Sequence, residues 1–275
     1  MKFRDILAIE TLGSATSAAS DLACQLAAQN GGAVSGAIVG WMPTVIMAEG
    51  WIASPVWEDL RKSTEVELDR NLTLLRRRLD AQDLPIRRVH RELLEDRQGM
   101  SRMSNLARHH DVCVIGSPQT DAERRLVEAV LFHSGRPVLV APLRWSPNPV
   151  GRIVVVAWKP TREASRALAE AEAFVSAASR TFVLRVDADG DQQDCCDAGE
   201  AAVAHLRRRG ANAESRVIAP VSETDGRAIL THAEAVRADL IVMGAYGRSR
   251  ASEFVFGGVT RELLSTTTIP ILMAH

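Results

Sequence analysis

The chain has 275 residues, which is enough for two domains of ordinary size, and 46% of them are hydrophobic and 24% charged, as in a soluble globular protein. The formal net charge of −1 gives no overall positive field for nucleic acid, and 4% aromatic residues offer few surfaces on which bases could stack. No apolar run approaches the ~20 residues of a membrane helix, and the N-terminus lacks the apolar core of a signal peptide. We therefore expect a cytoplasmic protein that binds neither nucleic acid nor membranes.

The four cysteines fit a reducing compartment, because no two of them form a C-x-x-C pair. Cys24 and Cys113 lie in apolar patterns and are predicted to be buried thiols, whereas Cys195 and Cys196 fall in a polar loop. His109-His110 has no evident third ligand. The sequence therefore predicts no metal site.

The first half of the chain alternates apolar strand patterns with helical patterns. Strands are expected at 6–9, 34–39, 86–92, 111–116 and 137–141, and helices at 15–29, 58–81, 96–109 and 122–133. The arginine run 76–78 is interpreted as the solvated face of its helix. Segment 40–57 holds three of the five tryptophans, at Trp41, Trp51 and Trp57. We expect it to cover its own domain as a flap, another subunit, or a ligand.

The second half repeats this plan after a proline-rich linker at 142–150. Strands are expected at 153–157, 182–186, 215–218, 240–243 and 269–273, and helices at 162–178, 199–209, 225–237 and after Gly258, with an acidic loop at 187–197. The alternation predicts an α/β protein with two tandem doubly wound domains, 1–141 and 151–275. Each would carry a five-stranded, mainly parallel sheet flanked by helices.

The stretch from Asp239 to Pro270 reads as strand, glycine loop and helix. Its glycines include Gly244, Gly247 and Gly257, spaced as Gly-x2-Gly-x9-Gly. Glycine lets backbone N–H groups approach an anion, and the start of a helix carries unpaired N–H groups and partial positive charge, so the stretch could hold a phosphate. The spacing fits neither the Walker loop nor the dinucleotide fingerprint. The other interpretation is that the glycines only make turns and close helix–sheet contacts.

In this spacing the stretch resembles the nucleotide-binding signature of the universal stress protein family. The resemblance implies an adenine nucleotide alpha hydrolase-like fold and a site for ATP, with Mg²⁺ accompanying the nucleotide. Two positions depart from the family pattern. Gly258 stands where ATP binders usually have Ser or Thr, and Lys159 stands after the first strand where they have an Asp that fixes the nucleoside. A lysine accepts no hydrogen bond but attracts an anion.

The two halves can be aligned as repeats. Residues 111–116 match residues 239–244, and Glu10 matches Lys159. The positions of the last two glycines, 257–258, fall on Arg124-Arg125 in the first half. We therefore expect the N-terminal domain to keep the fold without the glycine loop. Tandem halves of this kind are expected to pair through their last strands as an intramolecular pseudo-dimer, and a homodimer of whole chains stays open.

Parallel sheets bind ligands beyond the carboxyl ends of their strands, which gives a set of predicted nucleotide-binding residues. These are Ala157, Trp158, Lys159, Val186, Met243, Gly244, Gly247, Arg248, Gly257, Gly258, Val259 and Thr260. Lys159 and Arg248 of this set, together with Arg250, would make the entrance of the site positively charged. The predicted function is a stress-response protein that binds ATP or a related anionic nucleotide in its C-terminal domain and acts by conformation or association. The alternative is a protein–protein interaction module without nucleotide. No nucleophile motif predicts an enzyme, although slow ATP hydrolysis stays open.

Overall fold

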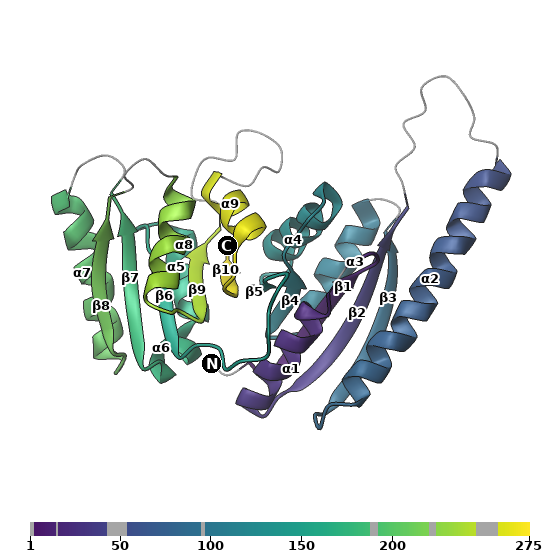
Figure 1. The fold of residues 1–275 in the computed structure, drawn as a ribbon, viewed down its shortest axis with the longest axis horizontal. Coiled ribbons are helices and arrows are strands. Elements are labelled where there is room, and N and C mark those ends of the chain that lie inside the picture. Colours follow the sequence, from purple (N-terminus) through teal and green to yellow (C-terminus); the bar gives the residue numbers. More distant parts are fainter. Residues whose placement is uncertain are drawn as a thin grey trace, which may run out of the picture. The chain divides into compact units, whose positions relative to one another are not determined.

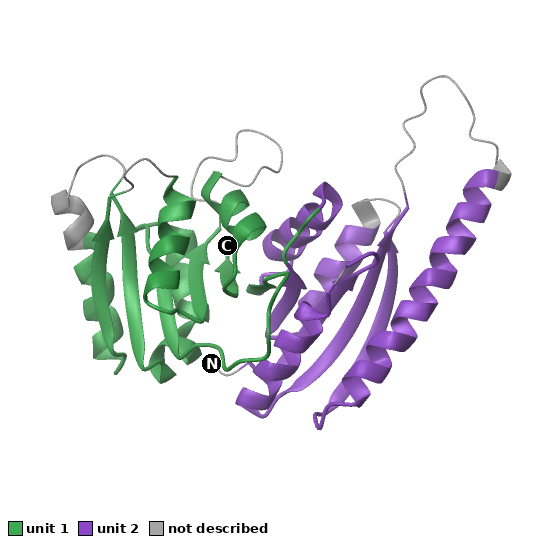
Figure 2. Cartoon of the chain, in the orientation of Figure 1, with its two compact units in different colours: residues 1–2, 117–119, 137–275 green, residues 3–116, 120–136 purple. Residues whose placement is uncertain are grey.

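The computed structural model describes residues 3–14, 16–42, 54–94, 97–187, 192–219, 224–245 and 258–275, without the side chains of 54–55, 97–98 and 192–197. These residues form two compact units (Figure 2). The N-terminal unit comprises residues 3–116 and 120–136, and the C-terminal unit comprises residues 117–119 and 137–275. Each unit is a sheet flanked by helices.

The N-terminal unit has four strands in the order β3-β2-β1-β4, all of them parallel. The strands are β1 (Asp5–Thr11), β2 (Ala33–Trp41), β3 (Ile86–Leu94) and β4 (Val112–Gly116). The helices are α1 (Ala18–Asn30), α2 (Ser54–Asp80), α3 (Arg97–Ala107) and α4 (Asp121–His133). Strand β4 is buried over nearly its whole length, as its continuous apolar run predicts.

The C-terminal unit has six strands in the order β5-β10-β9-β6-β7-β8. The strands are β5 (Val138–Ala141), β6 (Ile153–Ala157), β7 (Arg180–Val186), β8 (Ala213–Ile218), β9 (Leu240–Gly244) and β10 (Ile271–Ala274). The helices are α5 (Arg162–Glu170), α6 (Glu172–Ala177), α7 (Gln192–Arg208), α8 (Asp225–Ala235) and α9 (Gly258–Thr266). All pairs are parallel except β5 with β10, which is antiparallel.

Helices cover both faces of each sheet (Figure 1). Right-handed crossovers between parallel strands require α1 and α2 on one face and α3 and α4 on the other. The contacts agree, because α3 packs on α4 in the N-terminal unit and α8 packs on α9 in the C-terminal unit. The doubly wound α/β class predicted from the sequence is therefore confirmed, with five strands from each half of the described chain.

Strand β5 belongs to the first half by sequence and to the C-terminal unit by its contacts. It pairs antiparallel with β10, joining Val138 to Met273 and Val140 to Ile271. The last strands of the two halves thus pair with each other, as expected from the repeat. The compact units consequently divide the chain differently from the two sequence repeats.

Three helices differ from the predicted boundaries. Helix α7 begins at Gln192, so the predicted loop at 187–197 is half helical, and Cys195 and Cys196 lie on a helix backbone. The helix continues through Gly199, where a Cβ would approach Ser215 Oγ to 2.6 Å, so glycine permits close packing on β8. Helix α2 begins earlier than expected, and the helix predicted at 162–178 is two, α5 and α6. Within the described ranges no helix has the length and apolar character to cross a bilayer.

Candidate functional site

The carboxyl ends of β6, β7 and β9 lie side by side in the C-terminal unit. In the strand register Ala157 is paired with Met243 on one side and with Leu184 on the other. Val186 ends β7 two residues beyond Leu184, and Gly244 ends β9. The predicted residues of these three strands therefore converge at one edge of the sheet.

Gly244 is required there by packing. A Cβ at this position would lie 2.3 Å from the backbone nitrogen of Ala164 and 2.6 Å from the carbonyl carbon of Glu163. The end of β9 thus lies directly against the first turn of α5. The first glycine of the motif serves the close helix–sheet contact, which is one of the two interpretations that the sequence left open.

Trp158 follows β6 directly and turns toward α7. Its backbone N–H donates to Leu184 O at 2.8 Å, and its indole N–H donates to Ala198 O on α7 at 3.2 Å. The side chain is half-buried. Its ring is therefore fixed against α7, and its only N–H donor on the side chain is already used.

Lys159 is exposed beside the capped start of α5. Its carbonyl accepts from Thr161 N at 2.7 Å, and Thr161 Oγ1 caps the helix by accepting from Ala164 N. Within the described part of the chain no acid lies at ion-pair distance from the Lys159 ammonium group. The nearby acid Glu163 is buried and bonded to Arg162 at 3.1 Å. Burial alone would raise the pKa of Glu163, but bonds from its own backbone N–H, Arg162 and Thr161 lower it.

Helix α9 begins at Gly258 without an acid in its first turn. Gly258 is exposed, Val259 is half-buried and Thr260 is buried. A Cβ at Gly258 would meet no described atom within 4 Å. Because Thr260 faces the interior, its hydroxyl does not replace the one that the family pattern has at Gly258. The first turn of α9 therefore carries no acid, and the N–H groups of a first helical turn have no partner within the helix.

Several predicted residues lie outside the described residues. They are Gly247, Arg248, Arg250 and Gly257 of the loop, together with Trp51 and most of the tryptophan-rich segment. The side chains of Cys195 and Cys196 are also outside the description.

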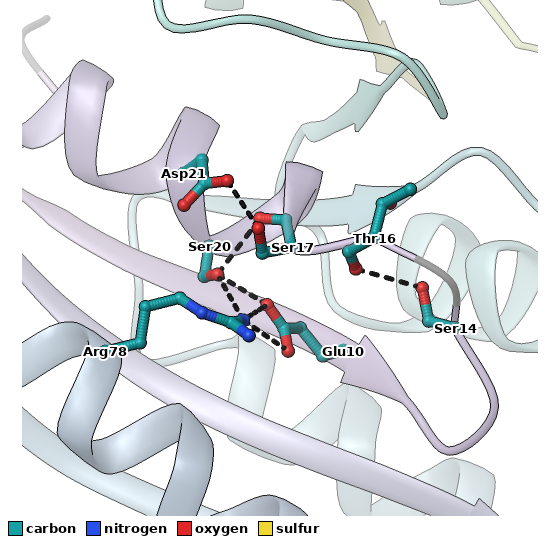
Figure 3. A network of polar contacts seen from close by, with 7 residues as sticks. All are labelled: Glu10, Ser14, Thr16, Ser17, Ser20, Asp21 and Arg78. Carbon is teal, nitrogen blue, oxygen red and sulfur yellow. Dashed lines mark hydrogen bonds and ion pairs between the residues drawn. The ribbon is translucent and has the colours of Figure 1, made fainter.

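In the N-terminal unit the carboxylate of Glu10, near the end of β1, already has partners within the protein (Figure 3). Glu10 accepts from Arg78 Nη1 at 3.0 and 3.2 Å and from Ser20 Oγ at 2.5 Å. Its side chain is only 11% exposed. The carboxylate of Glu10, which matches Lys159 in the alignment of the two halves, thus joins β1 to α1 and α2.

In the N-terminal unit the helix that corresponds to α9 is α4, and the N–H groups at its start are capped by side chains. Thr120 and Glu123 form a capping box at the start of α4, in which Glu123 N donates to Thr120 Oγ1 and Thr120 N donates to Glu123 Oε2. Glu123 Oε1 also accepts from Thr11 Oγ1 at 2.7 Å. An anion would therefore meet a carboxylate at this position instead of unpaired N–H groups.

The two cysteine side chains that the structure describes, those of Cys24 and Cys113, are buried. Burial raises the pKa of Cys24 to about 11 and that of Cys113 to about 12, so both stay as thiols, as predicted for buried cysteines. His110 is buried with Nδ1 3.0 Å from Leu106 O. No group of three or more metal-binding side chains occurs in the parts of the chain that the structure describes.

Sequence reasoning missed two features of these sites. The sequence places Arg78 on a solvated helix face, whereas the structure pairs it with Glu10. The two residues are 68 positions apart, and helical periodicity does not reveal contacts at that separation. The contact of Trp158 with Ala198 was also missed, because residue 198 was expected next to a loop. A buried acid after the first strand, with arginines on the next helix but one, is the signal that could have suggested the first pairing.

Comparison with known proteins finds one family model that the second half of the chain matches. Residues 151–275 match the model of the universal stress protein family. A universal stress protein from Archaeoglobus fulgidus DSM 4304 has a similar structure, with a TM-score of 0.66 and 15% identity over 98% of this chain and 96% of that one. A putative universal stress protein from Pseudomonas aeruginosa UCBPP-PA14 gives 0.58 and 12%, covering 99% and 93%. At these identities the similarity shows the fold. A search of curated proteins found no match.

Proposed function

Because residues 151–275 match the model of the universal stress protein family, we propose that this chain binds ATP or a related anionic nucleotide at the carboxyl edge of its C-terminal sheet. The nucleotide would lie near the ends of β6 and β9 and the start of α9. Binding would act through conformation or association, in the cytoplasm, and not through catalysis. Mg²⁺ would accompany the phosphates.

The contrast between two helix starts carries this proposal. The start of α4 is closed by Thr120 and the carboxylate of Glu123. The start of α9 has no acid in its first turn, and Gly258 is exposed there. Unpaired N–H groups and the helix dipole favour an anion at the second position and disfavour one at the first.

The charge near the edge supports an anionic ligand over a neutral one. Lys159 is exposed and has no acid at ion-pair distance among the described residues, so its ammonium group is available to a phosphate. The same lysine cannot accept a hydrogen bond from a ribose hydroxyl. We therefore propose that this site recognises the phosphates more strongly than the nucleoside.

An interaction module without nucleotide is the second candidate, and exposed apolar side chains on α2 favour it. Val56 and Val66 are 61% and 70% exposed, and Leu60 and Leu74 are 39% and 47% exposed. Large apolar side chains on one helix are common where a partner protein binds. This candidate requires no ligand at the start of α9.

ATP titration calorimetry on ligand-free protein tests the first candidate, with Gly258→Asp and Gly258→Asn as a matched pair. Both side chains have room, because a Cβ at Gly258 meets no described atom within 4 Å. Aspartate adds a negative charge where a phosphate would bind, and asparagine has the same shape without the charge. We expect wild type and Gly258→Asn to bind ATP and Gly258→Asp to lose binding while keeping its thermal stability, since an acid at a helix start is stabilising.

Two results would contradict the proposal. Wild-type protein that gives no heat with millimolar ATP would favour the interaction module. Equal ATP affinity in Gly258→Asp and Gly258→Asn would show that phosphates bind elsewhere. Lys159→Gln provides a second measurement, and its ATP affinity is expected to fall about tenfold through the lost charge–phosphate contact.

A further inference from the structure

A cleft lies between two helical segments on one face of the C-terminal sheet. Helices α5 and α6 form one wall and α7 forms the other, and the cleft has a volume of about 630 Å³. Its floor is made by the buried side chains of Leu168, Val175, Ala202 and Leu206. This volume lies in the range of ~300–1,000 Å³ that is typical of small-molecule sites with apolar linings.

Both ends of the cleft carry contacts that bridge its walls. At one end the indole N–H of Trp158 donates to Ala198 O on α7 at 3.2 Å. At the other end Arg209, just after α7, forms an ion pair with Glu172 at the start of α6. A helix or strand of a partner protein would have to break one of these bridges to lie along the cleft. A small molecule that fits between the two bridges would leave both of them intact.

The charges of the lining are concentrated at one end. Arg209 and His205 come from the end of α7, and Glu172 is the acid that faces them. A guanidinium group has five N–H donors, so its bond to Glu172 leaves donors for a second carboxylate. The Trp158 end is aromatic and apolar by contrast. The cleft is thus apolar along its floor, and its charged groups, the Arg209–Glu172 ion pair and His205, lie at one end.

We propose that this cleft binds a small amphipathic monocarboxylate, with its apolar body along the floor and its carboxylate at Arg209 and His205. From Ala198 to the end of α7 at Arg208 the helix rises about 15 Å, which suits an extended medium-length acyl chain. Burial of such a chain against Leu168 and Leu206 supplies the main driving force. The charged end fixes its direction.

This site differs in place and chemistry from the nucleotide site proposed above. It lies on the face covered by α5 and α7, whereas α9 packs with α8 on the opposite face. Trp158 is the residue that both sites share. Because the charged groups of the cleft are gathered at one end and include Glu172, a triphosphate would extend over the apolar floor, which disfavours ATP there.

Calorimetric titration of the full chain with decanoate, and separately with decanol, tests this proposal. Ala201 is exposed and lines the cleft, so Ala201→Leu fills it, whereas Ala204→Leu adds the same side chain to an exposed position outside the lining. We expect Ala201→Leu to weaken decanoate about tenfold by occupying the space, and Ala204→Leu to bind as wild type. Arg209→Gln should weaken decanoate about tenfold and leave decanol unchanged, with Arg208→Gln as its control.

Three outcomes would overturn the proposal. One is the absence of decanoate binding to the wild type. Another is equal affinity in Ala201→Leu and Ala204→Leu, which would place the ligand elsewhere. The third is a dimer in sedimentation experiments that decanoate does not alter and that Ala201→Leu dissociates, because the cleft would then be a contact between two copies of the chain.

Discussion

Asp111 and Asp239 occupy equivalent positions in the two halves and make the same kind of contact. Each directly precedes the fourth strand of its half and accepts backbone N–H groups at the start of the first strand. Asp111 accepts from residues 4 and 5 at 2.8 and 3.0 Å, and Asp239 accepts from residues 151–153, with a shortest distance of 2.8 Å. The repeat seen in the sequence thus preserves a specific hydrogen-bonding role as well as an apolar pattern.

Removing the carboxylate of Asp239 should destabilise the protein. Asp239→Ala leaves several partly buried N–H groups without their acceptor, and we expect the free energy of unfolding to fall by about 2 kcal/mol. Urea denaturation measures this loss. Asp239→Asn keeps one acceptor oxygen and should lie between the alanine variant and the wild type. An unchanged urea midpoint in Asp239→Ala would show that water replaces the carboxylate without cost.

Two glycines of the stretch from Asp239 to Pro270, Gly244 and Gly258, should respond in opposite ways to the same substitution. Gly244→Ala would force a Cβ to 2.3 Å from Ala164 N, so β9 and α5 must separate, and we expect a loss of about 3 kcal/mol in unfolding free energy. Gly258→Ala meets no described atom and should gain roughly 0.5 kcal/mol, because alanine favours a helix over glycine. Thermal unfolding of both variants checks the order. Similar melting temperatures would contradict the packing role of Gly244.

Much of the fold could be predicted because its signals are local. The continuous apolar runs of β4 and β9 and the alternation of strands and helices indicated a doubly wound fold, and the structure confirms it. Pairing of β5 with β10 followed from the repeat. Gly199 is a case where a local rule failed, since glycine usually weakens a helix, yet here it lets α7 contact β8.

The state of the candidate sites was less predictable because it depends on distant contacts. The sequence shows an acid at Glu10, but only the structure shows that Arg78 and Ser20 occupy it. It also offered Thr260 as a hydroxyl near the phosphates, whereas burial turns that side chain inward. Which side chains remain available to a ligand is decided by tertiary packing, which periodicity and spacing do not specify.

The Glu10–Arg78 pair should contribute to stability and not to ligand binding. The Arg78 side chain is 39% exposed, so solvent screening limits the coupling, and a double-mutant cycle with Glu10→Gln and Arg78→Met should give about 1 kcal/mol. Arg78→Met should leave ATP titration unchanged, because the N-terminal unit keeps Glu123 at the start of α4. Arg77→Met on the same helix is the control for the substitution. A gain of a second ATP site in Arg78→Met would refute this assignment.

His232 of α8 is packed where protonation is unfavourable. Its ring meets Phe182 of β7 edge-on, with 6.0 Å between the ring centres, and its Nε2 is buried without a hydrogen-bond partner among the described residues. Burial, and then the positive charge of Arg216 on β8, lower the pKa of His232 below its ordinary value of 6.5. The folded state therefore favours the neutral ring more than the unfolded state does.

This shift predicts a loss of stability in acid that depends on His232. Because the folded pKa is lowered, the unfolded state takes up the proton first, so the stabilisation is complete above pH 6.5 and is lost as the pH falls through the folded pKa. His232→Leu should therefore unfold with a weaker pH dependence than wild type between neutral and mildly acidic pH, as measured by urea denaturation across that range. Identical pH profiles for wild type and His232→Leu would show that the ring of His232 is hydrated in the folded protein.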